Sequence, residues 1–379
     1  MRLGILTTHP IQYQVPWFRL LARQPGVDLE VLYCMLPDAA QQGSGFGVSF
    51  EWDVPLLSGY TYRVLENRAR VPSVTTFFGC DTPEIYGILR QEPWDAFIVN
   101  GWVAKSCLQL LAACRLRGVP CLVRGESNAL RPRAAWKRGV HRLLLRQYVA
   151  FLAIGSQNRA FYLANGVAPE RIFAAPYCVE NERFAFDGRS LLTARPFTFL
   201  FSGKLIPKKR PMDVLKALAW LRAQAPDLAV GLVVAGDGEL RPDCEAFGAA
   251  EGLPVRFTGF LNQSQIGQAY READCLVLPS DNGETWGLVV NEGMASGMPA
   301  IVSDQVGCHP DLIVAGETGW TFGCGDVEGL GKRMLQMAED PEQAFRMGQA
   351  AARLVNEGYH YRRVVEGTVA ALRYLGLSV

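Results

Sequence analysis

Residues 197–236, FTFLFSGKLIPKKRPMDVLKALAWLRAQAPDLAVGLVVAG, contain two short apolar runs with a stretch of helical periodicity between them. The first run ends at Gly203, the helical pattern begins near Pro211, and the second run ends at Gly236. Buried parallel strands are continuous apolar runs, and a helix usually connects two of them. This stretch therefore predicts a strand, a helix and a second strand of a parallel sheet.

The same alternation of short apolar runs and helical periodicity recurs along the chain. We expect further strands at LGILTT, LEVLYC, AFIVNG, CLVRGE and AFLAIG in the first half, and at VRFTGF, CLVLPS and PAIVSD in the second. A chain of 379 residues exceeds the size at which one hydrophobic core usually stops growing. The pattern predicts an α/β protein of two doubly wound domains facing across a cleft, at residues 1–182 and 190–358, with a linker at 183–189.

Composition narrows the classes of function. A net charge of +1 argues against a dedicated nucleic-acid binder. The ten cysteines form no C-x-x-C pair, and no Asp-x-Asp occurs, so we expect no metal site. The first residues lack a secretory pattern, and no apolar run reaches the roughly 20 residues that span a bilayer. We expect a cytoplasmic protein whose membrane contact, if any, is peripheral.

Ligands of open α/β sheets bind beyond the carboxyl ends of the strands. This position selects Thr8, His9, Asn100, Trp102, Arg124 and Glu126 in the first domain, and Gly203, Lys204, Gly236, Asp237, Ser280 and Glu284 in the second. Many residues at strand ends only cap helices or close turns, so their position is a filter and not a proof of function.

In the second domain, the charge of the side chains supports the selection made from strand ends. Lys204 and Lys209 flank the expected start of a helix, and ammonium groups beside a helix N-terminus suit a diphosphate. A lysine-rich turn seen alone is more often a solvated surface. A second anion-binding helix start is expected around Trp286 or Gly287 in ETWGLVVNEG.

Two glutamates accompany this second helix start. The N–H groups of Trp286, Gly287 and Leu288 would face the cleft, with Glu284 just before them and Glu292 within the helix. Carboxylates accept hydrogen bonds from hydroxyls. A nucleotide-diphosphate sugar would use all of these groups. Its diphosphate would bind the lysines and the N–H groups, and its hydroxyls would bind the carboxylates.

Four segments carry a resemblance to a known family. FSGKLIPKKRP, VAGDGELR, VRFTGFLNQSQIGQAYREADCLVLPS and ETWGLVVNEGMASGMPAIVSD, in this order, resemble the nucleotide-binding half of family 4 retaining glycosyltransferases with the GT-B fold, over about residues 170–325. The resemblance implies Rossmann-like domains, a final helix at 359–379 that returns to the first domain, and a metal-independent reaction without a cofactor.

The resemblance also assigns roles to residues. It implies that Lys204 and Lys209 contact the diphosphate, Glu284 the donor sugar and Glu292 the ribose, while the turns at Gly236–Gly238 and Thr258–Leu261 approach the nucleoside. We take Lys204, Lys209 and Glu284 as catalytic candidates. The full set of donor-binding candidates is Gly203, Lys204, Lys209, Gly236, Gly238, Phe260, Glu284, Thr285, Trp286, Gly287, Leu288 and Glu292.

The acceptor side departs from the family pattern. LVRGES stands where many members have a histidine, and Tyr177-Cys178 replaces a common Asn-Gly. The acceptor-side candidates are His9, Trp102, Arg124 and Glu126. The expected acceptor is a hydroxyl of a glycan, a lipid-linked glycan or a small molecule.

Other interpretations stay open. One alternative is a non-catalytic subunit that binds a nucleotide sugar. Another is a nicotinamide-dependent oxidoreductase, but the sequence lacks the phosphate-loop fingerprint that such an enzyme needs. GSGFG at residues 43–47 follows no strand and is interpreted as a flexible loop. The stretch 131–146 has six basic residues and no acid; we expect either a solvated helix face or a surface that contacts anionic membrane, with Val140, Leu143 and Leu144 toward the core.

Overall fold

The computed structural model describes residues 1–43, 45–186 and 195–379. Residues 1–41, 54–177 and 361–379 form one compact unit, and residues 42–53 and 178–360 form the other. Residues 42–53 were expected in the N-terminal domain, but they pack with the second unit. Of the expected linker 183–189, residues 187–189 lie outside the described residues.

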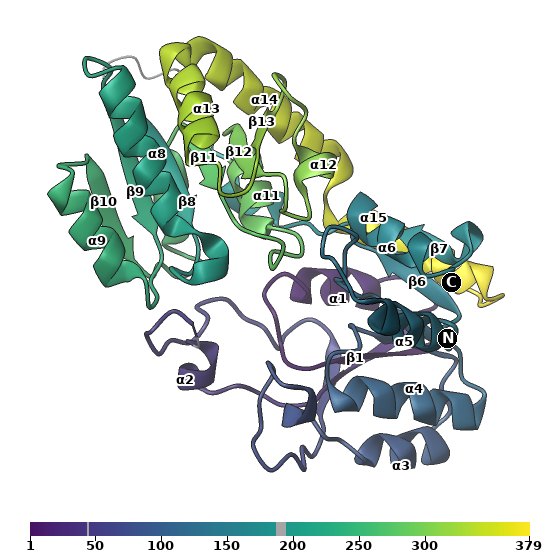
Figure 1. Ribbon diagram of the computed structural model, residues 1–379. Helices are drawn as coiled ribbons and strands as arrows, with labels where there is room; N and C mark the ends of the chain where they lie inside the picture. The colour runs from purple at the N-terminus through teal and green to yellow at the C-terminus, as the bar shows by residue number, and fades with distance from the viewer. Residues whose placement is uncertain (44, 187–194) are drawn as a thin grey trace. The chain divides into compact units, whose positions relative to one another are not determined.

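The first unit, which carries the labels β1, β6 and β7 in Figure 1, contains a parallel sheet of order β3-β2-β1-β4-β5-β6-β7. Its strands are β1 (Arg2–Thr7), β2 (Asp28–Tyr33), β3 (Thr61–Val64), β4 (Ala96–Val99), β5 (Cys121–Val123), β6 (Ala150–Ala153) and β7 (Ile172–Ala174). Its helices are α1 (Val15–Ala22), α2 (Ala39–Gln42), η1 (Phe77–Gly79), α3 (Glu84–Gln91), α4 (Lys105–Arg117), α5 (Ala135–Leu145), α6 (Ser156–Ala164), η2 (Pro169–Arg171) and α15 (Tyr361–Tyr374).

The second unit contains a parallel sheet of order β10-β9-β8-β11-β12-β13. Its strands are β8 (Phe197–Ser202), β9 (Val230–Ala235), β10 (Val255–Gly259), β11 (Cys275–Leu278), β12 (Ala300–Ser303) and β13 (Gly319–Phe322). Its helices are α7 (Asn181–Phe184), η3 (Pro207–Lys209), α8 (Pro211–Gln224), α9 (Arg241–Ala250), α10 (Ile266–Glu272), α11 (Leu288–Ala295), α12 (His309–Leu312), α13 (Val327–Glu339) and α14 (Pro341–Gly358).

These two sheets confirm the predicted α/β class and its doubly wound topology, which is that of the GT-B fold. In each sheet the chain starts at a central strand, winds to one edge and then returns to the other side. The cores are apolar as expected. Strand β8, which is the first apolar run of residues 197–236, contributes Phe199 and Phe201 to the core of the second unit.

The C-terminal helix α15 belongs to the first unit. It packs against α1, β6 and β7, although residues 178–360 of the second unit lie between β7 and α15 in the sequence. The hydroxyl of Tyr361 donates a hydrogen bond to the carbonyl of Tyr13 at 3.1 Å. The core of the first unit is therefore completed by the end of the chain.

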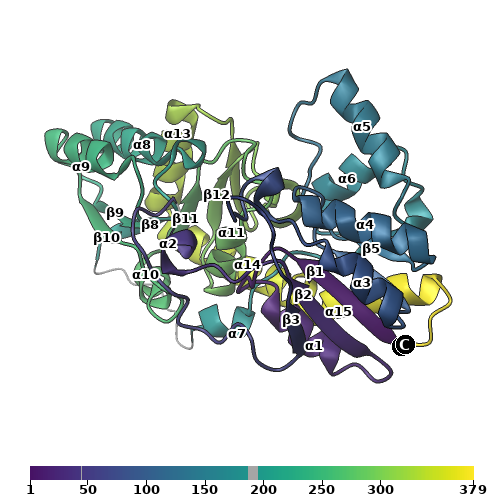
Figure 2. The ribbon, with the colours of Figure 1, turned by 90° about the horizontal axis from the view of Figure 1, so that it is seen from below.

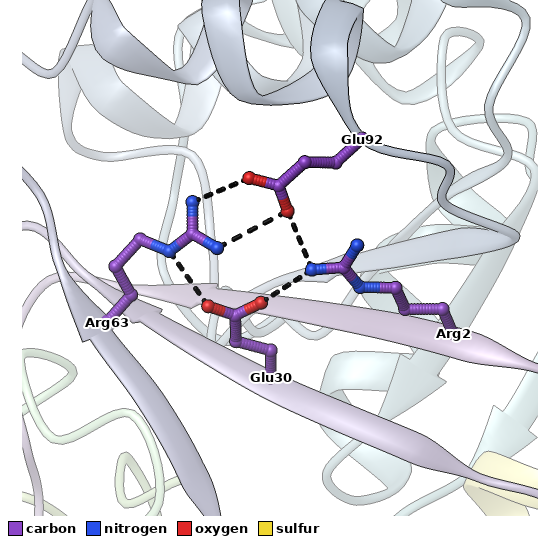
Figure 3. A network of polar contacts seen from close by, with 4 residues as sticks. All are labelled: Arg2, Glu30, Arg63 and Glu92. Atoms are coloured by element: carbon purple, nitrogen blue, oxygen red, sulfur yellow. Dashed lines mark hydrogen bonds and ion pairs between the residues drawn. The ribbon is translucent and has the colours of Figure 1, made fainter.

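An ion-pair network joins the first strands of the first unit (Figure 3). Arg2 on β1 contacts Glu30 on β2 at 3.0 Å and Glu92, just after α3, at 2.6 Å. Arg63 on β3 contacts the same two carboxylates, at 2.8 and 2.9 Å. Each charge has two opposite partners, so the network fastens the edge strand β3 and the end of α3 to the sheet.

Candidate functional site

The candidate donor site lies where the winding of the second sheet reverses. Strands β8 and β11 are neighbours, but β8 leads outward to β9 and β11 leads to β12. Loops leave such a pair of strands in opposite directions and open a crevice at their carboxyl ends. The loop after β8 carries Lys204 and Lys209, and the loop after β11 carries Glu284.

The two loops are joined directly. Lys209, the last residue of η3, forms an ion pair with Glu284, and the two side chains are 13% and 14% exposed. The N–H of Asp281 donates to the carbonyl of Lys208 at 2.9 Å. The structure therefore brings together two residues that the sequence assigned to one site from segments far apart in the chain.

Lys204 follows Gly203 at the end of β8. Its Nζ lies 4.8 Å from the ring centroid of Phe46. Burial lowers the pKa of Lys204, and the nearby charges of Lys208 and Lys209 lower it further. Three lysines within one loop create a local positive potential that an anionic ligand would relieve.

The loop before α11 turns sharply at Gly287. This residue has φ 103° and precedes the helix, which starts at Leu288. A side chain at this position would meet Leu278 at 2.9 Å and Val306 at 3.0 Å, so glycine is needed for both conformation and space. The first N–H groups of a helix have no partner within the helix, and those of α11 follow Glu284 closely.

Trp286 differs from its neighbours in this loop. Its side chain is 2% exposed, and its Nε1 donates to Oδ1 of Asn291 at 2.8 Å. The carbonyl of Trp286 accepts from the N–H of Cys308 at 3.0 Å. The Trp286 side chain therefore anchors the loop to the core of the unit, and its place in the donor-binding set rests on its backbone.

Glu292 lies one turn into α11 and is buried, with 3% of the residue exposed. The hydroxyl of Tyr270 on α10 donates to Glu292 Oε2 at 2.5 Å. The tyrosine thus fixes the orientation of the carboxylate. The two glutamates predicted for the site differ in setting, since Glu284 is ion-paired to a lysine and Glu292 is hydrogen-bonded to a phenol.

The glycines after β8 and β9 approach each other closely. Gly236 has φ 144°, and a Cβ at this position would lie 1.9 Å from the carbonyl oxygen of Gly203. The N–H of Gly236 donates to the carbonyl of Gly259 at 2.9 Å. Gly238 is equally constrained, because its Cβ would lie 2.6 Å from the carbonyl oxygen of Leu205. The turns expected near the nucleoside are therefore packed backbone to backbone.

Residues 45–53, which we call the aromatic segment, were not predicted at this site. Phe50 stacks on Phe260 with ring centroids 4.1 Å apart, and Phe46 meets Phe260 edge-on at 4.9 Å. The amide of Asn262 donates to the carbonyl of Glu51 at 2.7 Å. The GSGFG motif thus leads into a packed segment and not into a flexible loop; the closely spaced aromatics of GFGVSFEW are the signal that could have indicated it.

The acceptor-side candidates lie at the carboxyl ends of β1, β4 and β5 in the first unit. Trp102 stacks on Phe161 with centroids 6.1 Å apart, and a Cβ on Gly125 would lie 2.5 Å from the Trp102 ring. Trp102 therefore covers the backbone between Arg124 and Glu126.

Arg124 and Glu126 share one partner, Tyr177. The guanidinium of Arg124 lies 4.5 Å from the Tyr177 ring centroid and 5.1 Å from that of Trp17, and Arg124 is 6% exposed. The Tyr177 hydroxyl donates to a carboxylate oxygen of Glu126. Tyr177, noted in the sequence only as a departure from the family pattern, thus orients both candidates.

His9 is mostly buried at the end of β1. Its Nδ1 lies 2.9 Å from the Thr8 hydroxyl, and burial lowers its pKa to about 4. His9 is therefore neutral near pH 7, and its imidazole can act as a hydrogen-bonding group or a base.

Two general features concern the described residues as a whole. None of their helices is both long and apolar enough to cross a bilayer. They contain no group of three His, Cys, Asp or Glu side chains arranged to hold a metal ion.

A family match falls within the unit that carries the candidate donor site. Residues 183–354 match the family described as glycosyl transferases group 1. The chain is 34% identical over 182 residues to the D-inositol 3-phosphate glycosyltransferase of Streptomyces avermitilis, which covers 44% of this chain and 39% of the relative. It is 36% identical over 157 residues to the sulfoquinovosyl transferase SQD2 of Arabidopsis thaliana, covering 40% of this chain and 29% of that protein.

The fold similarity extends over the entire chain. The crystal structure of Anabaena HepE in complex with UDP and glucose has a TM-score of 0.72, with 14% identity, and covers 99% of this chain and 100% of HepE. The chain spans less than half the length of these curated relatives. The family match lies within the second unit, whereas the structural similarity includes both units.

Proposed function

We propose that this protein is a family 4 glycosyltransferase that transfers a sugar from a nucleotide-diphosphate sugar to a hydroxyl, with retention of anomeric configuration and without a metal ion. One observation carries the proposal: the Lys209–Glu284 ion pair beside Lys204 and the start of α11, at the strand ends where the second sheet reverses. The group 1 match and the UDP and glucose bound by HepE support it.

The charge that develops during the reaction suggests the roles of the lysines and of the start of α11. Cleavage of the bond from the anomeric carbon to phosphate builds negative charge on the departing diphosphate. Lys204, Lys209 and the first N–H groups of α11 stabilise this charge, as preorganised donors do in other active sites. The lysines supply the positive charge that a metal ion supplies elsewhere.

The carboxylates act on hydroxyls. Glu284 orients the donor sugar while holding the Lys209 ammonium, and Glu292, fixed by Tyr270, accepts a hydrogen bond from the ribose. The departing phosphate accepts the proton of the attacking acceptor hydroxyl, on the face from which it leaves. No covalent glycosyl-enzyme intermediate is required in this scheme.

The first unit binds the acceptor in this proposal. Trp102, Arg124, Glu126 and His9 are at the carboxyl ends of adjoining strands, where a glycan, a lipid-linked glycan or a small-molecule hydroxyl compound would bind. We place the enzyme in the cytoplasm, because all ten cysteines are free thiols and this fits a reducing compartment.

A screen of donors tests the proposal. Thermal unfolding is measured with UDP-, GDP-, ADP- and TDP-sugars and with NAD, and slow donor hydrolysis is then followed with the stabilising compound. We expect one nucleotide sugar to raise the unfolding temperature and wild-type protein to hydrolyse it. Glu284→Gln should hydrolyse it at least about a hundredfold more slowly, as loss of a preorganised charge does at other sites.

The control is Glu251→Gln, which changes an exposed glutamate of the same unit. Stabilisation without hydrolysis in wild-type protein would support the alternative of a non-catalytic nucleotide-sugar-binding subunit. Stabilisation by NAD alone would contradict the proposal.

A further inference from the structure

Helix α5 presents large apolar side chains to solvent. Trp136, Val140 and Leu143 are 68%, 53% and 63% exposed. Spacings of four and three residues place them on one face of the helix. Leu145 is the one residue of α5 that is buried, and Figure 2 shows the helix at the periphery of its unit.

This orientation corrects the expectation from the sequence. Val140, Leu143 and Leu144 were expected to face the core. Val140 and Leu143 lie on the outer face instead, whereas Leu144 is partly buried and packs against the core as expected. Periodicity identified an amphipathic helix but assigned its apolar stripe to the core. The core contacts of this part of the first unit come from Leu144, Leu145 and Tyr148.

The same helix is strongly basic. Five exposed cationic side chains lie in or beside it: Arg131, Lys137, Arg138, Arg142 and Arg146. No acidic residue occurs between Glu126 and Glu170. Within the described part of the chain, none of the salt bridges involves these five residues. Their charge is therefore available to an anionic partner.

We propose that α5 docks the protein on an anionic lipid bilayer. Trp136, Val140 and Leu143 enter the boundary between headgroups and acyl chains, while the basic side chains contact anionic headgroups, as in other interfacial amphipathic helices. Tryptophan is enriched at this depth because its ring is apolar and its N–H is polar.

Charge and size favour a bilayer over a protein partner. Three apolar side chains are a small part of the about 800 Å² that each partner buries in a stable protein interface. Two copies of α5 placed face to face would also bring two clusters of positive charge together. The inference is independent of the proposed reaction, because binding to lipid needs neither donor nor acceptor.

Vesicle flotation of the full-length protein tests the charge. We expect binding to vesicles of phosphatidylcholine mixed with phosphatidylglycerol, little binding to phosphatidylcholine alone, and release by high salt. The variant Lys137→Gln/Arg138→Gln/Arg142→Gln should bind about a hundredfold more weakly, because each cation near an anionic surface contributes about fivefold. Wild-type protein that fails to float at low salt would overturn the proposal, as would equal flotation of this variant.

Brominated lipids, which quench tryptophan on insertion, test the depth. Wild-type fluorescence should be quenched by anionic brominated vesicles, whereas Trp136→Phe should still float but lose most of the quenching. Leu143→Ser should bind at least tenfold more weakly.

The matched control is Leu116→Ser on α4, which changes an exposed leucine between Arg115 and Arg117 and should bind like wild type. Equal quenching in Trp136→Phe would overturn the assignment to α5. So would sedimentation showing that Leu143→Ser dissociates a dimer of the wild-type protein.

Discussion

At the residue scale, the proposed chemistry depends on the nearly buried Lys209–Glu284 ion pair. A buried ion pair loses much of its Coulomb energy to desolvation, so it is weak evidence for stability. Its more direct consequence is positional, since the carboxylate holds the ammonium of Lys209 at the carboxyl ends of β8 and β11. A bound diphosphate would then meet a cation that needs little rearrangement.

Lys204→Ala tests this assignment of charge. We expect turnover to fall by about a hundredfold or more, as it does when one donor is removed from a charge-stabilising site. Steady-state kinetics with the donor from the thermal screen provides the measurement. Lys216→Ala is the control, because Lys216 is exposed on α8 and its loss leaves the loop intact. A Lys204→Ala enzyme with most of its turnover would exclude that lysine from the site.

Position and chemistry made these residues predictable. Lys204, Lys209 and Glu284 follow apolar runs, and the carboxyl ends of parallel strands lie at one edge of a sheet. The environment of each side chain was not predictable in this way. Trp286 follows Glu284 by two residues, yet its ring is buried and its Nε1 donates to Asn291. The packing of the folded unit decides this contact, and the position of Trp286 in the sequence does not reveal it.

Edge strands limit prediction at the element scale. The ten predicted strands are all present, but β3, β7 and β13 were missed, and all three lie at an edge of a sheet. An edge strand has a neighbour on one side only, so its sequence is under less pressure to be apolar. TYRV in β3 is largely exposed and has no apolar run. IFA in β7 is apolar but only three residues long and partly buried, which is too short a run to predict a strand.

The aromatic segment yields a prediction at this scale. Phe50→Ala removes the stack on Phe260, and an aromatic pair is worth about 1 kcal/mol beyond its buried area. We expect cleavage after Glu51 by a glutamate-specific protease to become about fivefold faster, because the segment opens more often. Phe78→Ala, at a phenylalanine of η1 that is 73% exposed, should leave the rate unchanged. Equal rates for Phe50→Ala and wild type would show that the stack does not hold the segment.

At the scale of the whole molecule, contacts between distant parts of the chain determine which segments belong to which unit. Residues 45–53 pack with the second unit and α15 with the first, and neither follows from local periodicity. The resemblance to a family indicated the return of the last helix. The closely spaced aromatics of residues 45–53 indicated a packed segment at most, and not the unit against which it packs. Local pattern thus predicts the strands and their order of winding, but not which unit receives an irregular segment.

His9 links the stability of the protein to pH. Its pKa is about 4 in the folded protein and about 6.5 when unfolded, so the unfolded chain binds more protons between these values. The free energy of unfolding therefore falls as pH falls from about 6.5 to 4, and this contribution is fully present above 6.5. His9→Asn should lose less stability than wild type between pH 7 and pH 4.5, measured by urea denaturation. Parallel losses in both proteins would contradict the low pKa.

A crystal structure of the protein with the nucleotide sugar selected by the thermal screen tests the proposed donor site most directly. We expect the ammonium groups of Lys204 and Lys209 to lie about 3 Å from diphosphate oxygens, with the sugar hydroxyls at Glu284 and the ribose at Glu292. A diphosphate bound elsewhere, with the Lys209–Glu284 pair untouched, would contradict it.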